Sequence, residues 1–291
     1  MISVIIPHLN DAGLEACLKS LEAQDGYWDT WEVLVVDNGS RVPPVALCNR
    51  FERVRMLVED CPGPGPARNL GAANAKGEIL AFTDADCTVA PNWLAEINKG
   101  MADPSTSVLG GAVEVAYDTP DHPKFTEPYE RVYSFRNELH IAEGYSASAN
   151  LAVRSEVFEQ VGGFEGRNIA EDQDWGLRAS HLGYAPRYHP AMVVHNSSRQ
   201  DFAALRRKWA RHIAHDYNMK PSKPAWTFRA FCILASPIAE IGTVVKTAKL
   251  TNLHERFLCF VCLCGIRAYR SWTMLAVLLR GKAEIRWNEP T

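Results

Sequence analysis

The sequence lacks the short motifs that mark several large classes of nucleotide-binding protein. No G-x-G-x-x-G follows the first strand-like run, and G-x-x-x-x-G-K-[ST] is absent, so a dinucleotide fingerprint and a P-loop have no support. The eight cysteines do not form the regular framework of a secreted disulfide domain. Residues 2–7 are too short for the apolar part of a signal peptide and have no basic leader. We therefore expect a protein of the reducing cytoplasm.

The C-terminal third also lacks an uninterrupted run of about 20 apolar residues, the length that a membrane-spanning helix needs. The run Trp226–Val245 is interrupted by Arg229, Pro237 and Glu240, and the run Phe257–Leu279 contains two arginines. A basic, aromatic segment precedes them. These patterns predict helices that do not span a membrane.

Charge is divided unevenly along the chain. From residue 201 onward there are 15 Lys and Arg against 6 Asp and Glu, whereas residues 1–200 carry a net charge of −12. The basic C-terminal region places Lys and Arg beside Trp209, Trp226, Trp272 and Trp287. This pattern favours amphipathic helices at the surface of an anionic membrane; a helical cap or a dimer contact is the alternative. No base-stacking platform or known module supports nucleic-acid binding.

The first 200 residues alternate between strand-like and helix-like segments. This alternation predicts an α/β fold with a mainly parallel, Rossmann-like sheet and right-handed crossovers. We assign residues 1–200 to a catalytic domain and residues 201–291 to a helical C-terminal appendage. The expected strands are Ile2–Ile6, Trp31–Val36, Val54–Val58 and Ile79–Phe82, and the expected helices between them are Leu14–Ala23, Val45–Arg50 and Ala67–Ala75.

Polar residues follow three of these strands. Pro7, His8 and Asn10 follow the first strand, the segment Asp37–Ser40 (DNGS) follows the second, and Asp84–Asp86 (DAD) follows the fourth. In open α/β sheets, ligands bind beyond the carboxyl ends of the strands. We therefore expect the ligand site at this edge.

The segment ILAFTDADC ends a buried strand in two aspartates, Asp84 and Asp86. Paired carboxylates suit Mg²⁺ or Mn²⁺, which prefer oxygen ligands and often share their coordination shell with substrate phosphates. The spacing alone is weak, because a solvated turn can carry the same two residues. The strand before it and the expected helix after Pro91 favour a metal site.

Taken together, these segments resemble the family 2 glycosyltransferases, which have the GT-A fold. The resemblance extends from Ile2 to about His195, two thirds of the chain, and five blocks occur in the family's order. The blocks are SVIIPHLND, VLVVDNGS, GPARNLGAANAKGEILAFTDADC, NLAVRSEVFEQVGGFEG and AEDQDWGLRASHLGY.

The resemblance implies an inverting enzyme that moves a sugar from a nucleotide-diphosphate sugar to a hydroxyl acceptor, using Mn²⁺ or Mg²⁺. The acceptor class stays open among glycans, polysaccharides and lipid-linked molecules, as do the nucleotide and the sugar. An inactive sugar-nucleotide-binding scaffold with a partner-docking tail is the alternative. Retention of both Asp86 and Asp172 argues against it.

The resemblance also implies roles for individual residues. Asp84 and Asp86 would bind the cation, with His195 as a third ligand or else a structural hydrogen-bonding group. Asp172 would be the base that takes the acceptor proton, beside Glu171; without the resemblance both would be read as charges that complement a helix dipole.

Further residues would contact the substrates. Pro7, His8, Asn10 and Ala85 would line the donor site, with Asp37 and Asn38 facing the base or ribose and Arg68 facing the base or the phosphates. The family usually has Asp at position 38, so Asn38 puts a UDP donor in doubt and leaves GDP and dTDP sugars open. Ser148 and Asn150 would line the floor near the sugar or lie in a surface turn. Trp175 would offer an apolar platform or pack in the core.

Overall fold

The computed structural model describes residues 1–26, 30–117, 122–165, 170–197, 201–218 and 222–280. The chain forms two compact units. The first contains residues 1–114 and 136–196, and the second contains residues 115–135 and 197–291. The second unit therefore includes 115–135, a segment that we had assigned to the catalytic domain by sequence. Trp287 lies outside the described residues.

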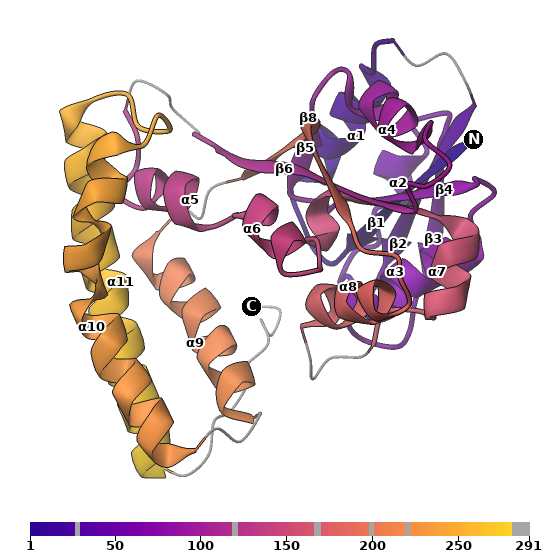
Figure 1. Cartoon of the computed structure of the whole chain (residues 1–291). Helices are drawn as coiled ribbons and strands as arrows, with labels where there is room; N and C mark the ends of the chain where they lie inside the picture. The colour runs from indigo at the N-terminus through magenta and orange to yellow at the C-terminus, as the bar shows by residue number, and fades with distance from the viewer. Residues whose placement is uncertain (27–29, 118–121, 166–169, 198–200, 219–221, 281–291) are drawn as a thin grey trace. The chain divides into compact units, whose positions relative to one another are not determined.

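The element order alternates strands and helices through the first half of the chain (Figure 1). The strands are β1 Ile2–His8, β2 Trp31–Asp37, β3 Val54–Val58, β4 Ile79–Phe82, β5 Cys87–Val89, β6 Val108–Ala116, β7 Leu151–Arg154 and β8 Arg187–Ser197. The helices are α1 Leu14–Glu22, α2 Val45–Cys48, α3 Pro64–Ala73, α4 Trp93–Met101, α5 Glu127–Tyr133, α6 Asn137–Ala142, α7 Ser155–Val161, α8 Glu171–His181, α9 Phe202–Asn218, α10 Lys223–Lys246 and α11 Leu253–Arg280. A short 3₁₀ turn covers Ser148–Asn150. The four predicted strands and the helices between them are all present.

The sheet is mixed, with the strand order β3-β2-β1-β4-β7-β6-β8-β5. Strands β3, β2, β1 and β4 are parallel, as the strand–helix alternation predicted. Beyond β4 the pairings β4–β7, β7–β6 and β8–β5 are antiparallel. The expectation of a mainly parallel sheet therefore holds for the N-terminal half only, because the later strands return without the regular helical crossover.

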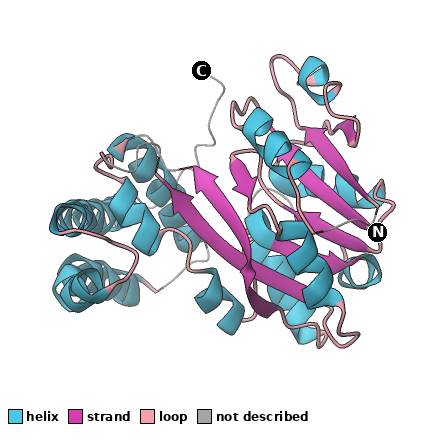
Figure 2. Cartoon of the chain, turned by 90° about the horizontal axis from the view of Figure 1, so that it is seen from above, coloured by secondary structure: helices cyan, strands magenta, loops and turns pink. Residues whose placement is uncertain are grey.

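Two apolar clusters cover the two faces of this sheet, and the strands run between layers of helices (Figure 2). Alternation along β1 sends Val4 and Ile6 to one face and Ile5 to the other. Helices α1 and α4 pack on the first face, and α7 and α8 contribute to the cluster on the second. Because both faces of the sheet are covered, polar side chains gather where the strands end.

The second unit is helical. Helices α10 and α11 pack against each other, and α11 also packs on α5 and α9. Cys259 and Cys262 are buried among apolar side chains there, consistent with thiols that act as packing residues. All eight cysteines are free.

Helices α10 and α11 are each long and apolar enough to cross a membrane, by length and composition. Only 22% and 33% of the most apolar stretches of α10 and α11 are buried. Pro237 lies inside α10 without ending it. The polar residues and the proline that interrupt the two apolar runs thus lie inside continuous helices.

Candidate active site

The two predicted metal-binding carboxylates lie in the turn between β4 and β5. Ligand atoms of Asp84, Asp86 and Cys87 lie within 4.8 Å of one another. The loop after β1 seats against this turn, since a Cβ added to Gly13 would lie 3.0 Å from the Ala85 carbonyl oxygen. The Ala85 side chain itself is buried in the core, so any contact it makes with a donor comes from its backbone.

Asp86 lies in a strongly negative environment. Burial, followed by the charges of Asp84 and Asp11, raises the pKa of Asp86 to about 6. The Asn196 amide nitrogen donates a hydrogen bond to Asp86 Oδ1 at 3.1 Å and is itself buried. Asp11 and Asn196 were missed in the sequence, although each neighbours a residue that we selected.

This donor set fits a hard divalent cation. A divalent cation between two neighbouring carboxylates offsets the repulsion between their charges. The Cys87 thiol donates a hydrogen bond to Asp86 Oδ1 at 3.5 Å, and burial and the two aspartates raise its pKa well above its ordinary value. Asp84 and Asp86 are thus the residues that would hold the ion.

His195 is not part of this cluster in the described residues. Its Nδ1 lies 3.6 Å from Glu114 Oε2, and its side chain is 38% exposed. The register of β8 on β5 places Asn196 opposite Cys87 and His195 opposite Thr88. Neighbouring strand residues point to opposite faces, so Asn196, rather than His195, reaches Asp86.

Arg68 joins the carboxylate pair to the predicted base helix. Its Nη2 donates to Asp84 Oδ1 at 2.7 Å and its Nη1 donates to Glu171 Oε1 at 3.1 Å, while the side chain is 4% exposed. Burial alone would lower the pKa of Arg68, but the two carboxylates more than offset this and raise it. We expected Arg68 at the base or phosphates; it lies instead between two acidic groups that are 87 residues apart in sequence.

One face of α3 fixes the chain segment that leads to α8. Asn69 and Phe164 exchange two hydrogen bonds, from Nδ2 to the carbonyl oxygen and from the backbone N–H to Oδ1, both 2.8 Å long. A Cβ on Gly65 would approach the Glu165 carbonyl oxygen to 2.7 Å. Positions 65, 68 and 69 share a helix face, so α3 holds this segment and Glu171 together.

Asp172 lies at the N-terminal turn of α8, beside Glu171. Burial and then the Glu171 charge raise the pKa of Asp172 to about 6, although Arg68 lowers it. A carboxylate with a pKa near the working pH is suited to accept a proton from a hydroxyl group. The structure thus brings Asp84, Asp86, Glu171 and Asp172 into one acidic region with Arg68 at its centre.

Three predicted sugar-contacting residues are buried instead. Trp175 is 1% exposed, stacks on Phe158 and donates its indole N–H to the Gly162 carbonyl oxygen at 2.9 Å. It therefore belongs to the core, and the platform role is wrong. Asn150 is fully buried, and its amide bonds Trp93 and the backbone of β6 and β8, while Ser148 is 5% exposed. Neither lies in a surface turn.

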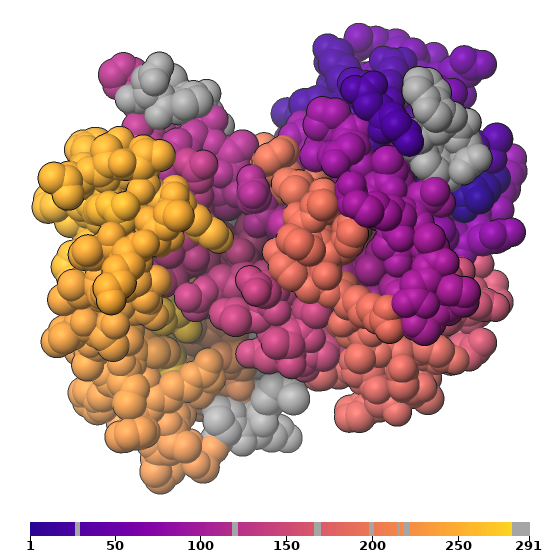
Figure 3. Space-filling model, turned by 45° about the horizontal axis from the view of Figure 1, so that its top comes forward, coloured from indigo at the N-terminus to yellow at the C-terminus, as the bar shows by residue number. Residues whose placement is uncertain are grey.

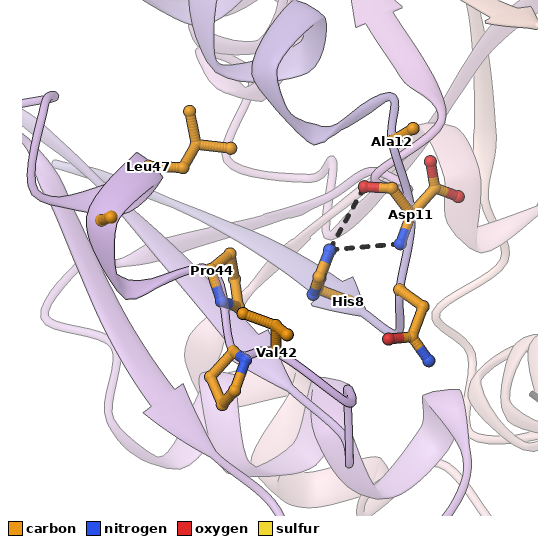
Figure 4. A pocket seen from close by; sticks show the side chains of 9 residues that line it. His8, Asp11, Ala12, Val42, Pro44 and Leu47 are labelled. Carbon is orange, nitrogen blue, oxygen red and sulfur yellow. Dashed lines mark hydrogen bonds between the residues drawn. The ribbon is translucent and has the colours of Figure 1, made fainter.

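A cavity of about 390 Å³ opens at the ends of β1 and β2 (Figure 4). Val42, Pro43, Pro44 and Leu47 supply apolar walls. The polar side is formed by His8, Asn10 and Asp11.

Asp37 orients the histidine at this cavity rather than lining it. Asp37 is 1% exposed, and its Oδ1 lies 3.0 Å from His8 Nδ1. The His8 Nε2 lies 3.3 Å from the backbone N and O of Asp11 (Figure 4). Asn10 has a positive φ of 50°, and its Oδ1 accepts from the Arg41 N–H. Pro7 is a half-buried member of β1.

Asn38 is occupied with the chain between β3 and α3. Its Nδ2 donates to the Glu59 and Cys61 carbonyl oxygens at 2.8 and 2.9 Å, and its Oδ1 accepts from the Gly63 N–H at 2.6 Å. An aspartate has no N–H to donate. An aspartate could therefore not make the two bonds that Asn38 donates, and Asn38 braces the 59–63 segment.

The five sequence blocks from SVIIPHLND to AEDQDWGLRASHLGY occur in the order of one known family. The family model described as Glycosyl transferase family 2 matches residues 3–162, more than half of the chain. The chain belongs to glycosyl transferase family 2. The family that the sequence blocks indicated is thus confirmed.

Relatives of this glycosyl transferase family 2 chain include Glycosyltransferase AglE of Haloferax volcanii, 33% identical over 192 residues, which are 63% of this chain and 62% of AglE. The Pre-mycofactocin glycosyltransferase of Mycobacterium tuberculosis is 29% identical over 215 residues, 68% of this chain and 43% of that protein. The chain therefore spans less than two thirds of the length of both relatives.

Solved structures confirm the GT-A fold of the chain. The mannosyltransferase PcManGT of Pyrobaculum calidifontis, in complex with GDP-Man and Mn²⁺, has a TM-score of 0.63 at 23% identity and covers 97% of this chain and 87% of its own. S. aureus TarS 1–349, in complex with UDP-GlcNAc, has a TM-score of 0.54 at 15% identity and covers 99% of this chain and 98% of its own. At these identities the similarity shows the fold alone.

Proposed function

We propose that this chain transfers a sugar, with inversion, from a nucleotide-diphosphate sugar to a hydroxyl acceptor. The observation that carries the proposal is the acidic region around Arg68, where the Asp84–Asp86 pair and the start of α8 meet. One-step inversion needs charge neutralisation on the leaving diphosphate and a base on the opposite side of the sugar. The two groups of carboxylates supply one function each.

In this proposal Asp84 and Asp86 hold Mn²⁺ or Mg²⁺. A bound cation would offset the negative charge that develops on the leaving phosphate. The carboxylate oxygens, the raised pKa of Asp86 and the protonated Cys87 thiol support an oxygen-ligated divalent ion. The cavity between His8 and Leu47 is our proposed site for the nucleoside, with apolar walls for the base.

Asp172 is the proposed base. As the acceptor hydroxyl attacks the anomeric carbon, its proton passes to an Asp172 carboxylate oxygen and the sugar–phosphate bond breaks. Arg68 keeps part of the Asp172 population ionised, because its charge opposes the effects of burial and of Glu171. Asn196 supports the cation site through its hydrogen bond to Asp86, and the charge of Asp11 makes the site more negative.

The test separates binding from turnover. Nucleotide-sugar binding is measured by thermal stabilisation with Mn²⁺ or with EDTA, and transfer is measured with a hydroxyl acceptor. We expect Asp86→Ala and EDTA to remove both, and Asp172→Asn to keep donor binding but lose transfer by orders of magnitude, since a carboxamide cannot take the proton. Ser155→Ala, at the start of α7, is the control. Full transfer in EDTA contradicts the metal role, and binding without any transfer in the unaltered chain supports an inactive scaffold.

We also propose that α10 and α11 attach the enzyme peripherally to the cytoplasmic face of a membrane, near a lipid-linked acceptor. Each helix carries an exposed apolar stripe. Figure 3 shows the surface of the C-terminal helical region in orange and yellow. The exposed residues recur every three to four positions on α10, a spacing that places them on one helix face. They are Phe228, Phe231, Leu234, Ile238, Ile241 and Val245 on α10, and Leu253, Phe257, Val261, Trp272 and Leu279 on α11.

Vesicle flotation tests this attachment. The full chain should float with anionic vesicles, and high salt should weaken the binding without removing it, since the apolar stripes also contribute. Phe228→Ser with Ile238→Ser should reduce flotation, and Leu182→Ser, an exposed apolar residue of the first unit, should not. Alkaline washing should release a peripheral protein; retention would instead indicate that α10 and α11 span the bilayer.

A further inference from the structure

Two buried arginine nitrogens without an acceptor lie close together in the helical unit, the Nε atoms of Arg267 and Arg270. The indole Nε1 of Trp209 lies beside them and faces the Tyr129 hydroxyl. The Arg270 guanidinium lies 3.7 Å from the centroid of the Trp209 ring. Arg267 is one helical turn before Arg270 on α11, and both charges act on Tyr129 of α5. We call these four residues the arginine cluster.

The cluster has no carboxylate partner within the described ranges. No ion pair or hydrogen bond joins Arg267 or Arg270 to an acidic side chain there. Among the other charged groups that act on Arg270, Asp216 is paired with Arg229 at 2.8 Å, so these two charges largely cancel. Glu255, the acidic residue of α11, lies at the opposite end of that helix, where it is hydrogen-bonded to Thr251 and Asn252.

Two positive charges therefore remain in a partly buried environment. Burial and the like charge of Arg267 lower the pKa of Arg270 to about 10, which leaves it charged at neutral pH. Burial raises the pKa of the Tyr129 hydroxyl to about 12, so it is neutral and cannot serve as a counter-ion. Buried donors are normally bonded and buried charges are normally paired. An anion is the partner that this arrangement lacks.

We propose that the arginine cluster binds a phosphate group. Guanidinium groups match phosphate oxygens in planar, paired hydrogen bonds. A phosphate has enough oxygens to accept from both guanidinium groups. The phosphate can belong to a soluble molecule or to a lipid headgroup, and this site is separate from the proposed transfer reaction. Its test needs no turnover, so either proposal can fail without the other.

The first test measures pyrophosphate binding to the full chain by calorimetry. EDTA is present, so that cation-dependent binding at Asp84 and Asp86 does not contribute. Arg267→Gln with Arg270→Gln should bind at least about tenfold more weakly than the unaltered chain, which is about 1.4 kcal/mol. The matched control, Lys246→Gln with Arg280→Gln, removes the same charge from exposed positions of α10 and α11 and should bind like the unaltered chain.

Stability distinguishes a binding role from a structural one. Without anion, the cluster variant should melt at the same temperature as the unaltered chain or higher, because two unpaired charges have been removed. A lower melting temperature would mean that the arginines hold the helices together, and it overturns the proposal. Arg270→Lys keeps the charge but loses the planar donor pair; it should fold and bind more weakly, and unchanged binding also overturns the proposal.

Vesicles separate the two sources of phosphate. Phosphatidylcholine vesicles with and without phosphatidic acid are compared for the unaltered chain, the cluster variant and the control variant. A gain from phosphatidic acid that only the cluster variant loses assigns a lipid headgroup. Binding of pyrophosphate without such a gain assigns a soluble phosphate. Equal losses in the cluster and control variants would show diffuse charge attraction and refute the site.

Discussion

Replacing Arg68 with Gln removes one positive charge from the centre of the acidic region and leaves Asp84 and Glu171 without their shared partner. Arg68 contacts Asp84 Oδ1 at 2.7 Å, an oxygen of a carboxylate that we propose as a metal ligand. A divalent cation must therefore bind beside the guanidinium and against its repulsion. We expect Arg68→Gln to bind Mn²⁺ more tightly than the unaltered chain while it loses transfer activity.

The magnitude follows from the charges and their exposure. Two unit charges about 4 Å apart interact by about 1 kcal/mol in water and about 4 kcal/mol near a protein surface. For a divalent cation even the lower figure doubles to about 2 kcal/mol, which is more than tenfold in affinity. The variant should also lose stability. Breaking a buried pair costs about 3–5 kcal/mol, and since the Asp84 and Glu171 side chains are 32% and 21% exposed, we expect about 2 kcal/mol.

Mn²⁺ is titrated into the protein without nucleotide, and binding is monitored by calorimetry or by the electron paramagnetic resonance signal of the free ion. Arg68→Lys keeps the charge and is the matched control, which should retain the weaker affinity of the unaltered chain. Thermal unfolding establishes that each variant is folded at the temperature of the titration. Equal or weaker Mn²⁺ binding by folded Arg68→Gln would refute the idea that the guanidinium competes with the cation.

Four further outcomes follow from the structure. Burial and neighbouring charge raise the pKa of Asp86 to about 6. The stability that the neutral form of Asp86 provides is therefore present below about pH 4 and is lost as pH rises through about 6, by about 1–2 kcal/mol after allowance for exposure. Asp86→Asn should remove this pH dependence of the free energy of unfolding. Transfer should decline as pH falls through about 6, where Asp172 becomes protonated. A pH–rate profile that stays flat between about pH 5 and about pH 7 would argue against this base. Asn38→Asp loses the two bonds that Nδ2 donates to the Glu59 and Cys61 carbonyl oxygens and should raise KM for the donor about tenfold with a smaller change in kcat, as steady-state kinetics would reveal. Trp175→Ala should lower the free energy of unfolding by about 3–5 kcal/mol without changing sugar preference in a donor panel.

The parallel half of the sheet and the acidic strand end could be predicted from sequence because they depend on local patterns. The run Ile79–Phe82 is apolar and strand-like, and the carboxylates follow directly. In contrast, the choice between His195 and Asn196 depends on the register of β8 against β5. A shift of one residue exchanges the two faces of a strand. The sequence of β8 alone does not contain that register.

Burial was the second quantity that local patterns left open. Trp175 follows Asp172 by three positions, so the two lie near one helix face, yet the indole turns into a core built from α7 and the 162–165 segment. Asn150 is polar, but its buried amide joins two strands. The inclusion of residues 115–135 in the helical unit likewise depends on packing between α5 and α11, which lie far apart in sequence.

The contacts of α3 have a consequence for hydrogen exchange and heat inactivation. Residues of α3 contact Phe164, Glu165 and Glu171 directly. Local unfolding of α3 therefore frees, in the same event, the chain segment that leads to α8. Groups that open together exchange their amide protons with a common free energy. The amides of α3 and of Phe164 should therefore exchange as one unit. On warming, cation affinity and proton transfer should be lost together, even where the rest of the sheet remains folded.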